Sequence, residues 1–195
     1  MKAIVCKKFA PVSQLVWEEV DDPVAGPGEV VIDIKAAGLN YPDNLIVQGL
    51  YQFQPARPFS PGHEGAGIIS SVGDGVEVHS VGDKVAFFKG FGAFAEKIVV
   101  PSQLAFSIPE KLSHHIAAGM FMVYGTSYHA LVQRANISKD DDVLVLGAAG
   151  GVGAGGGGDR RGGGRAVQGP LSLSEVGQER LLGAQGGVQE HGAAR

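Results

Sequence analysis

The stretch that decides the fold is Asp142-Val143-Leu144-Val145-Leu146-Gly147-Ala148-Ala149-Gly150-Gly151-Val152-Gly153. Residues 142–146 form an apolar run rich in Val and Leu, which is typical of a buried strand in a parallel sheet. The glycine-rich turn that follows is typical of the opening of a dinucleotide-binding unit, where an amphipathic helix comes next. The sequence therefore predicts the start of an α/β unit at this point.

The glycine turn supplies the clearest candidate binding residues. Ala148 takes the first position of the GxGxxG pattern, Gly150 lets the backbone approach a pyrophosphate, and Gly153 lets the helix pack on the strand. Gly151 and Val152 complete the turn. The pyrophosphate of such a site is held partly by the N-terminus and dipole of the following helix.

The chain changes in composition after Gly153. Seven of the ten residues in 155–164 are glycine, and each costs about 1 kcal/mol relative to alanine in a helix, or about 7 kcal/mol together. We therefore predict that no helix forms here and that residues 154–195 are a disordered Gly/Arg-rich tail. Residues 154–195 contain arginine but no lysine, and this favours the hypothesis that they are an out-of-frame translation of GC-rich DNA. A natural flexible tail is the alternative.

The region before the glycine turn reads as many short strands separated by Gly/Pro turns, with one short helix at residues 41–47. Strands at this spacing favour a closed or partly open β-barrel. The strands are expected at residues 3–6, 15–18, 29–37, 65–72, 84–88, 94–100 and 104–107.

The pattern becomes helical near residue 113. Ser113 is a candidate N-cap, and apolar residues follow it at helical spacing. A break is expected at residues 125–127, before a second helix over 128–135.

Composition narrows the function classes. The chain of 195 residues is 44% hydrophobic and carries a net charge of -4, which argues against nucleic acid or an anionic membrane as a partner. The one cysteine, Cys6, excludes an intrachain disulfide framework. No apolar run approaches the length of a transmembrane helix, and the N-terminus lacks signal-peptide features. We expect a cytoplasmic protein, or a mitochondrial one if an N-terminal extension precedes Met1.

Four motifs in residues 1–153, taken in order, support a family resemblance. They are Ala36-Ala37-Gly38-Leu39-Asn40-Tyr41-Pro42-Asp43 with Gly49-Leu50-Tyr51, then Pro61-Gly62-His63-Glu64-Gly65-Ala66-Gly67, then Val81-Gly82-Asp83-Lys84-Val85 with Gly92-Ala93-Phe94-Ala95-Glu96, and finally Tyr124-Gly125-Thr126-Ser127-Tyr128 with the glycine turn. In this order they resemble the medium-chain dehydrogenase/reductase superfamily, in its zinc-free quinone oxidoreductase branch.

The resemblance implies a mixed α/β and β fold. A GroES-like β-barrel domain would occupy residues 1–122, and an interdomain helix with the first strand and glycine loop of a Rossmann domain would occupy 123–153. Residues 154–195 would be the tail. The resemblance ends at Gly153, so the chain is expected to be C-terminally truncated, with an incomplete barrel and an unpaired strand at 142–146 that lowers solubility.

Ligand chemistry argues against zinc. A catalytic zinc needs three protein ligands, and the zinc-dependent relatives place Cys where this chain has Asn40. His63 and Glu64 remain, but two candidates do not make a site. His63 is therefore expected to pack or hydrogen-bond at the start of a strand. His114 and His115, as sequence neighbours, are expected on the surface.

The resemblance implies NADPH as cofactor, bound in the cleft between the two domains, with hydride passing to a quinone or similar activated acceptor. Asn40 and Asp43 would lie near the nicotinamide, Tyr51 would line the substrate cleft, and Thr126 would touch the cofactor. Turn chemistry is the alternative for Asn40 and Asp43, and core packing is the alternative for Tyr51. The residues themselves do not decide between NAD and NADP.

Alternative functions remain open at this point. They are an alkenal or enone reductase of the same superfamily, a non-catalytic paralogue that binds a nucleotide or partner, and a short form that regulates the full-length protein. Full-length relatives are expected to be homodimers. We expect this chain to bind NADPH poorly and to be inactive, because the phosphate-binding helix is predicted to be absent.

Overall fold

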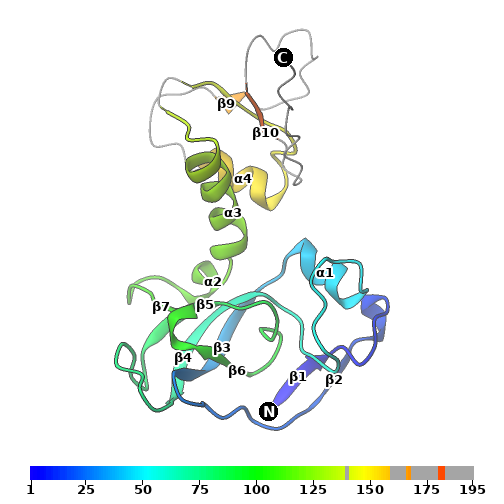
Figure 1. The fold of residues 1–195 in the computed structure, drawn as a ribbon, viewed down its shortest axis with the longest axis vertical. Coiled ribbons are helices and arrows are strands. Elements are labelled where there is room, and N and C mark those ends of the chain that lie inside the picture. Colours follow the sequence, from blue (N-terminus) through cyan, green and yellow to red (C-terminus); the bar gives the residue numbers. More distant parts are fainter. Residues whose placement is uncertain (139–140, 159–165, 168–179, 183–195) are drawn as a thin grey trace, which may run out of the picture. The chain divides into compact units, whose positions relative to one another are not determined.

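The computed structural model describes residues 1–138, 141–158, 166–167 and 180–182. The chain divides into two compact units, Met1–Met122 and Val123–Arg195. We call these the first and second unit and describe each by itself (Figure 1). None of the helices in the described ranges combines the length and the apolar character that crossing a bilayer requires.

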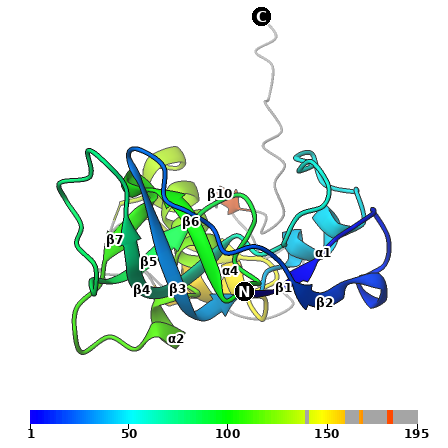
Figure 2. The same ribbon diagram turned by 90° about the horizontal axis from the view of Figure 1, so that it is seen from below.

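The first unit is built on an antiparallel five-stranded sheet in the order β6-β3-β4-β5-β7, whose strands lie side by side in Figure 2. A separate antiparallel pair joins β1 to β2. Two isolated bridges, Ala3 with Ala95 and Cys6 with Phe59, connect β1 and the residue after it to the rest of the unit. The strands are β1 (Lys2–Val5), β2 (Val16–Glu19), β3 (Glu29–Gly38), β4 (Glu64–Val72), β5 (Lys84–Phe88), β6 (Lys97–Pro101) and β7 (Ala105–Ser107).

These strands match the predicted ones to within a few residues, apart from the start of β6. The strands of the first unit do not close into a barrel in the described residues, because their hydrogen bonding is divided between the open five-stranded sheet and the β1–β2 pair. Short 3₁₀ turns, η1 (Val12–Gln14) and η2 (Ser102–Leu104), join strands that are consecutive in the chain, β1 to β2 and β6 to β7.

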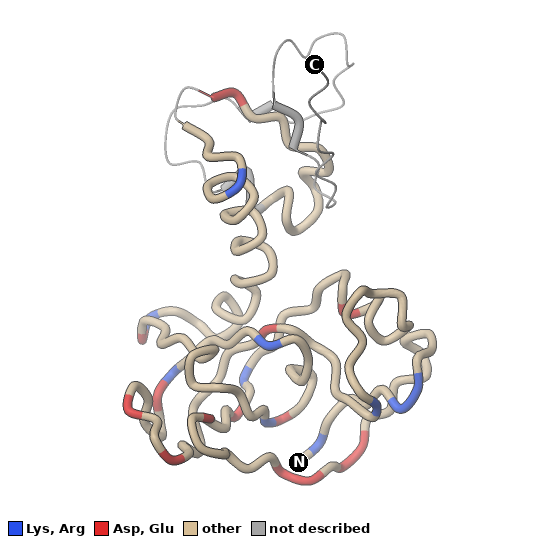
Figure 3. Tube along the Cα trace, in the orientation of Figure 1, with Lys and Arg blue, Asp and Glu red and all other residues tan. Residues whose placement is uncertain are grey.

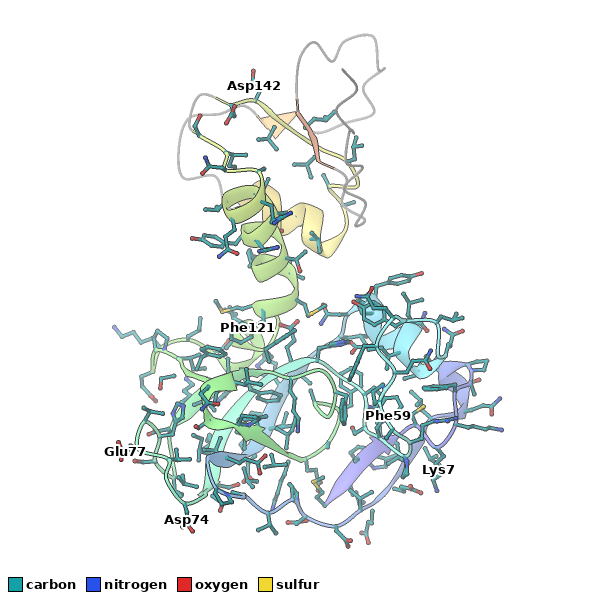
Figure 4. The ribbon with its side chains drawn as sticks, viewed as in Figure 1. Lys7, Phe59, Asp74, Glu77, Phe121 and Asp142 are labelled. Carbon is teal, nitrogen blue, oxygen red and sulfur yellow. The ribbon has the colours of Figure 1, made fainter. Side chains whose placement is uncertain are left out.

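Three apolar clusters form the core of the first unit. The largest lies against the sheet, where Val30 and Ile32 of β3 and Phe87 of β5 are fully buried. A second surrounds Cys6 with Ile46, Val47 and Phe59, and Phe59 is labelled in Figure 4. A third joins small residues of β4 and β5 to Ala117 and Ala118. Burial of this apolar surface is the main force that holds the unit together.

The single cysteine belongs to the second cluster. Cys6 is a buried free thiol, and burial raises its pKa above the ordinary value, partly opposed by the charge of Arg57. Figure 3 shows that basic and acidic residues are interspersed along the first unit.

The helices begin where the sequence places caps. Helix α1 (Tyr41–Val47) follows Asn40, and α2 (His114–Ala117) follows Ser113, whose hydroxyl accepts a hydrogen bond from the Ile116 N–H at 3.3 Å. Ser113 is therefore the N-cap that the sequence predicted. His115 is exposed as expected, whereas His114 is half-buried and its Nε2 is sealed from solvent without a hydrogen bond.

The predicted break at residues 125–127 is wrong. The chain stays helical through η3 (Phe121–Gly125), α3 (Thr126–Tyr128) and η4 (His129–Arg134), and η3 and η4 are π-helical turns. Gly125 has ordinary helical angles, φ -61° and ψ -42°. Glycine weakens a helix without ending it, and the wider turns absorb the local irregularity.

The second unit contains a parallel three-stranded sheet in the order β10-β8-β9. Its strands are β8 (Val143–Val145), β9 (Ala166–Val167) and β10 (Arg180–Leu182). The prediction of an unpaired strand is therefore wrong, since β8 is the central strand and Val143 and Leu144 are buried. Low solubility was expected because this strand would have had an open apolar edge, and this reason no longer applies.

The prediction that no helix follows Gly153 is also wrong, because α4 spans Gly151–Gly158. The first helical bond of the segment runs from the Ala154 N–H to the Gly150 carbonyl oxygen at 2.8 Å. The low helix propensity of glycine adds a free-energy cost to a helix but does not prevent one from forming. Tertiary context routinely overrides this propensity. Residues 159–165, 168–179 and 183–195, where the disordered tail was predicted, lie outside the described residues.

Candidate functional site

The first candidate site is centred on the N-terminus of α1. Asn40 is half-buried at the end of the β3 connection, with extended backbone angles of φ -125° and ψ 154°. Its backbone N–H donates to Oδ2 of Asp43 at 2.8 Å, which caps the helix from its third residue. The alternative interpretation of Asn40 and Asp43 was that they form a turn. This hydrogen bond shows that forming the turn at the start of α1 is one of their roles.

Asp43 also holds His63. The carboxylate Oδ1 of Asp43 lies 2.6 Å from Nδ1 of His63, and the two residues are only 3% and 6% exposed. The imidazole ring of His63 stacks on Phe88 with ring centroids 6.5 Å apart. His63 hydrogen-bonds immediately before β4, as the sequence predicted. The second oxygen of Asp43 serves the helix cap, so one buried carboxylate fixes both neighbours.

Glu64 completes the network from the first residue of β4 and is 1% exposed. Its Oε1 accepts from Nδ2 of Asn40 at 2.8 Å, and its Oε2 accepts from the backbone N–H groups of Phe121 and Met122 at 2.8 Å and 3.0 Å. The side chain of Asn40 is thereby held with its amino group toward Glu64. Phe121 is labelled in Figure 4. Three donors compensate the cost of burying this carboxylate.

The donor set fits zinc poorly. Both carboxylates of the network already accept hydrogen bonds on each oxygen, and the Asn40 amide is engaged with Glu64. Among the residues that the structure describes, no three His, Cys, Asp or Glu side chains gather in a way that could hold a metal ion. The zinc-free reading remains a prediction that this chemistry favours.

The contacts described for Tyr51 and Thr126 are not with the residues of this network. Tyr51 is half-buried and packs against the cluster of Cys6, Ile46, Val47 and Phe59. The structure thus supports packing as one role of Tyr51 and leaves its substrate role a prediction. Thr126 begins α3 in the second unit and is exposed.

The second candidate site is the glycine turn between β8 and α4. Gly147 has a left-handed φ of 71°, which glycine adopts without strain. Its carbonyl oxygen accepts from the Gly150 N–H at 3.0 Å and closes the turn. An added Cβ at Gly153 would lie 2.5 Å from that same oxygen, so only glycine fits there. Gly153 thus allows the close approach that the sequence pattern predicted.

The first turn of α4 offers unpaired backbone donors. The N–H groups at the start of a helix have no partner within the helix, and Gly151, Val152 and Gly153 occupy these positions. Such donors, together with the helix dipole, suit a phosphate group. Ala148 lies in the turn that leads to them.

Ser127 anchors this turn. Its buried hydroxyl lies 2.8 Å from the Val152 carbonyl oxygen and 3.0 Å from that of Val123, and its one proton serves both. Ser127 and Gly147 were missed by the sequence reasoning. The sequence does carry a signal for Gly147, because it is the first glycine after the strand. No local signal links Ser127 to residues that lie 25 positions away.

Residues 26–110 match the family described as the alcohol dehydrogenase GroES-like domain. Over this part the chain resembles the quinone oxidoreductase-like members of the medium-chain dehydrogenase/reductase superfamily.

Two curated relatives and one solved structure illustrate the similarity. The chain is 40% identical over 129 residues to the human synaptic vesicle membrane protein VAT-1 homolog, covering 66% of this chain and 33% of that protein. It is 36% identical over 149 residues to quinone oxidoreductase-like protein 2 of Rattus norvegicus, covering 76% and 42%. The sequence-based resemblance had pointed to the quinone oxidoreductase branch, which agrees with the name of this second relative.

The quinone oxidoreductase from Thermus thermophilus, solved also as its complex with NADPH, superposes with a TM-score of 0.73 at 33% identity. The match covers 85% of this chain and 52% of that one. The chain therefore spans about half the length of this structure and less than half of the two curated relatives.

Proposed function

We propose that this chain takes part in hydride transfer from NADPH to a quinone or a similarly activated acceptor, without zinc. The observation that carries the proposal is the glycine turn between β8 and α4, in which Gly147 and Gly153 permit a close backbone approach. The choice of NADPH over NADH rests on the similarity to a quinone oxidoreductase solved with NADPH.

The second unit supplies the binding part of the proposed role. When NADPH is bound, its nicotinamide supplies the hydride. The backbone donors of Gly151, Val152 and Gly153 would hold its pyrophosphate, and Ser127 keeps the turn in place through the Val152 carbonyl.

The first unit supplies the polar groups proposed to orient the acceptor. Glu64 holds the Nδ2 group of Asn40, so the amide of Asn40 keeps one orientation. A quinone carbonyl is already electrophilic and needs positioning more than Lewis-acid activation. Because the carboxylates of Asp43 and Glu64 are engaged by N–H donors, they support this zinc-free reading.

The first test is the affinity of the purified chain for NADPH, measured by titration calorimetry. Six of the eight residues of α4 are glycine, and this costs about 1 kcal/mol for each position. We expect binding weaker than micromolar for this reason. Replacing Gly155 and Gly157 by alanine should stabilise the second unit by about 2 kcal/mol and tighten NADPH binding. Micromolar affinity in the unaltered chain would contradict the expected weakness.

The second test is NADPH oxidation at saturating cofactor, followed with menadione as the quinone and with an alkenal as the competing acceptor. Preference for menadione supports the proposal, and preference for the alkenal replaces it by an enone reductase. Cofactor binding without turnover of either acceptor favours a non-catalytic nucleotide-binding role. At NADPH concentrations below saturation we expect turnover by this chain to be very slow, because weak cofactor binding limits it.

A further inference from the structure

The Asp43–His63 pair is a buried ionisable pair of the first unit to which the proposed function has given no chemical step. The short contact of 2.6 Å between Oδ1 and Nδ1 is typical of a charge-assisted hydrogen bond. A carboxylate that accepts a hydrogen bond from Nδ1 keeps the proton on that nitrogen and fixes the orientation of the ring. The pair therefore sets His63 up to gain and lose a proton at its other nitrogen, Nε2.

The Nε2 atom of His63 is the free end of the pair. Within the described part of the chain it has no hydrogen-bond partner, and it is not among the polar side-chain atoms sealed from solvent there. The ring is held at its edge by the contact between Nδ1 and Asp43, and its face stacks on Phe88. A fixed imidazole with one reachable nitrogen is the arrangement that a proton donor needs.

The charged side chains of Glu64 and Lys89, near His63 in the fold, are engaged in other contacts, so His63 is the candidate proton donor. Glu64 is its sequence neighbour, and its carboxylate is committed to Asn40 and to the backbone of residues 121–122. Lys89 donates its backbone N–H to the His63 carbonyl at 2.7 Å, but its Nζ donates to the Val99 carbonyl at 2.8 Å. Burial lowers the pKa of Lys89, and the charge of Glu29 opposes this. Asp43 is the acidic group in direct contact with the ring.

We propose that His63, oriented by Asp43, delivers the proton that the acceptor oxygen needs once hydride has arrived. This inference rests on the proposed function. Hydride from a reduced nicotinamide adds to the conjugated acceptor, and the displaced electron pair moves to the carbonyl oxygen. That oxygen takes the proton from Nε2 of the imidazolium, which gives an enol, and the enol formed from a quinone then tautomerises to the hydroquinone. Neutral His63 then regains a proton from solvent, and the oxidised nicotinamide leaves.

The same geometry also suits a metal ligand, because metal-binding histidines commonly donate their other N–H to a carboxylate. The proposal favours the proton donor because the carboxylate oxygens around His63 already accept hydrogen bonds and Asn40 offers no thiol. A zinc titration of the chain decides this point. Stoichiometric zinc binding that the His63→Gln variant loses would overturn the proposal.

The main test compares two ligands without any turnover. Menadione is a neutral naphthoquinone, and lawsone is a hydroxynaphthoquinone that ionises to an oxygen anion like the one formed by hydride addition. Affinities are measured by calorimetry across the pH range in which histidines titrate. We expect lawsone to gain about tenfold over menadione as His63 becomes protonated, because a charged donor strengthens a hydrogen bond to an oxygen anion.

Variants make the test specific. His63→Gln should abolish the pH-dependent preference for lawsone over menadione, and Asp43→Asn should reduce this preference. His115→Gln, at an exposed histidine, is the matched control and should behave as the unaltered chain. Thermal unfolding checks that each variant folds, and Asp43→Asn serves as the test if His63→Gln does not.

The outcomes separate the two proposals. Binding of menadione with no preference for lawsone, or a preference that survives His63→Gln, overturns the proton-donor role alone. If neither naphthoquinone binds to the unaltered chain, the proposed acceptor site fails and the proton-donor role fails with it. A preference that depends on His63 and on pH supports both.

Discussion

The two units build their candidate sites from different materials. In the first unit the site consists of side chains, Asn40, Asp43, His63 and Glu64, whose hydrogen bonds compensate their burial. In the second unit the site consists of backbone, and side chains beyond hydrogen are excluded at Gly153. The comparison teaches that the first site is sensitive to the loss of polar atoms, whereas the second is sensitive to the gain of a single carbon.

The largest expected effect is on the first unit, from Glu64→Ala. The substitution leaves the Asn40 amide and the N–H groups of Phe121 and Met122 without their acceptor. We expect a loss of about 3–5 kcal/mol in the free energy of unfolding, as for breaking a buried charged network. Urea unfolding of the unaltered and variant chains measures it.

Glu77→Ala is the matched control, because Glu77 is exposed and is labelled in Figure 4. It should change the free energy of unfolding by less than about 0.5 kcal/mol. Equal effects of the two substitutions would show that the Glu64 network contributes little.

The next effect tests the backbone site, from Gly153→Ala. The new Cβ would meet the Gly147 carbonyl oxygen and the Ala148 Cα at 2.5 Å and 2.8 Å, which are backbone atoms that cannot rotate away. We expect a loss of about 1–3 kcal/mol in the stability of the second unit. Hydrogen exchange of the second unit reports the stability. NADPH affinity should fall further, and calorimetry with the stabilised Gly155→Ala/Gly157→Ala background keeps that fall measurable.

Gly125→Ala sharpens the comparison, because it is the same change in the same unit at a position with open space and helical angles. It should stabilise the helix by up to about 1 kcal/mol. If both substitutions stabilise, close approach at Gly153 is not the reason for glycine there.

The smallest effect concerns a surface charge group of the first unit. Hydrogen bonds from Lys97 and from the N-terminal ammonium lower the pKa of Asp22 from 3.8 to about 2. A carboxyl whose pKa is lower in the folded state adds stability above pH 3.8, and this stability is lost as the pH falls through about 2. The group is fully exposed, so salt should weaken the contribution.

Asp22→Asn should therefore flatten the decline of stability in this acidic range, with little change near neutral pH. Thermal unfolding at low and high salt measures it, with Asp21→Asn as the control. An unchanged acid profile in Asp22→Asn would show that the contact does not persist in solution.

Much of the first unit could be predicted from local pattern. Alternation and turn residues located the strands, Ser113 was predicted as a cap, and Asn40 and Asp43 were singled out together. The role of Glu64 could not be predicted, because its partners lie 24 and 57 positions away. Hydrogen bonds between residues so far apart in the sequence produce no periodic pattern that sequence analysis could detect.

The sequence by itself determined the strand and the glycine turn, since a Val/Leu run followed by glycines is typical of the opening of a dinucleotide-binding unit. It also determined that Asn, and not a thiol, stands at position 40. Only the tertiary structure decided that β8 lies between two parallel strands and that α4 forms despite its glycines. The physical reason is that propensity counts each residue alone, whereas pairing and packing depend on segments that meet only in the folded chain.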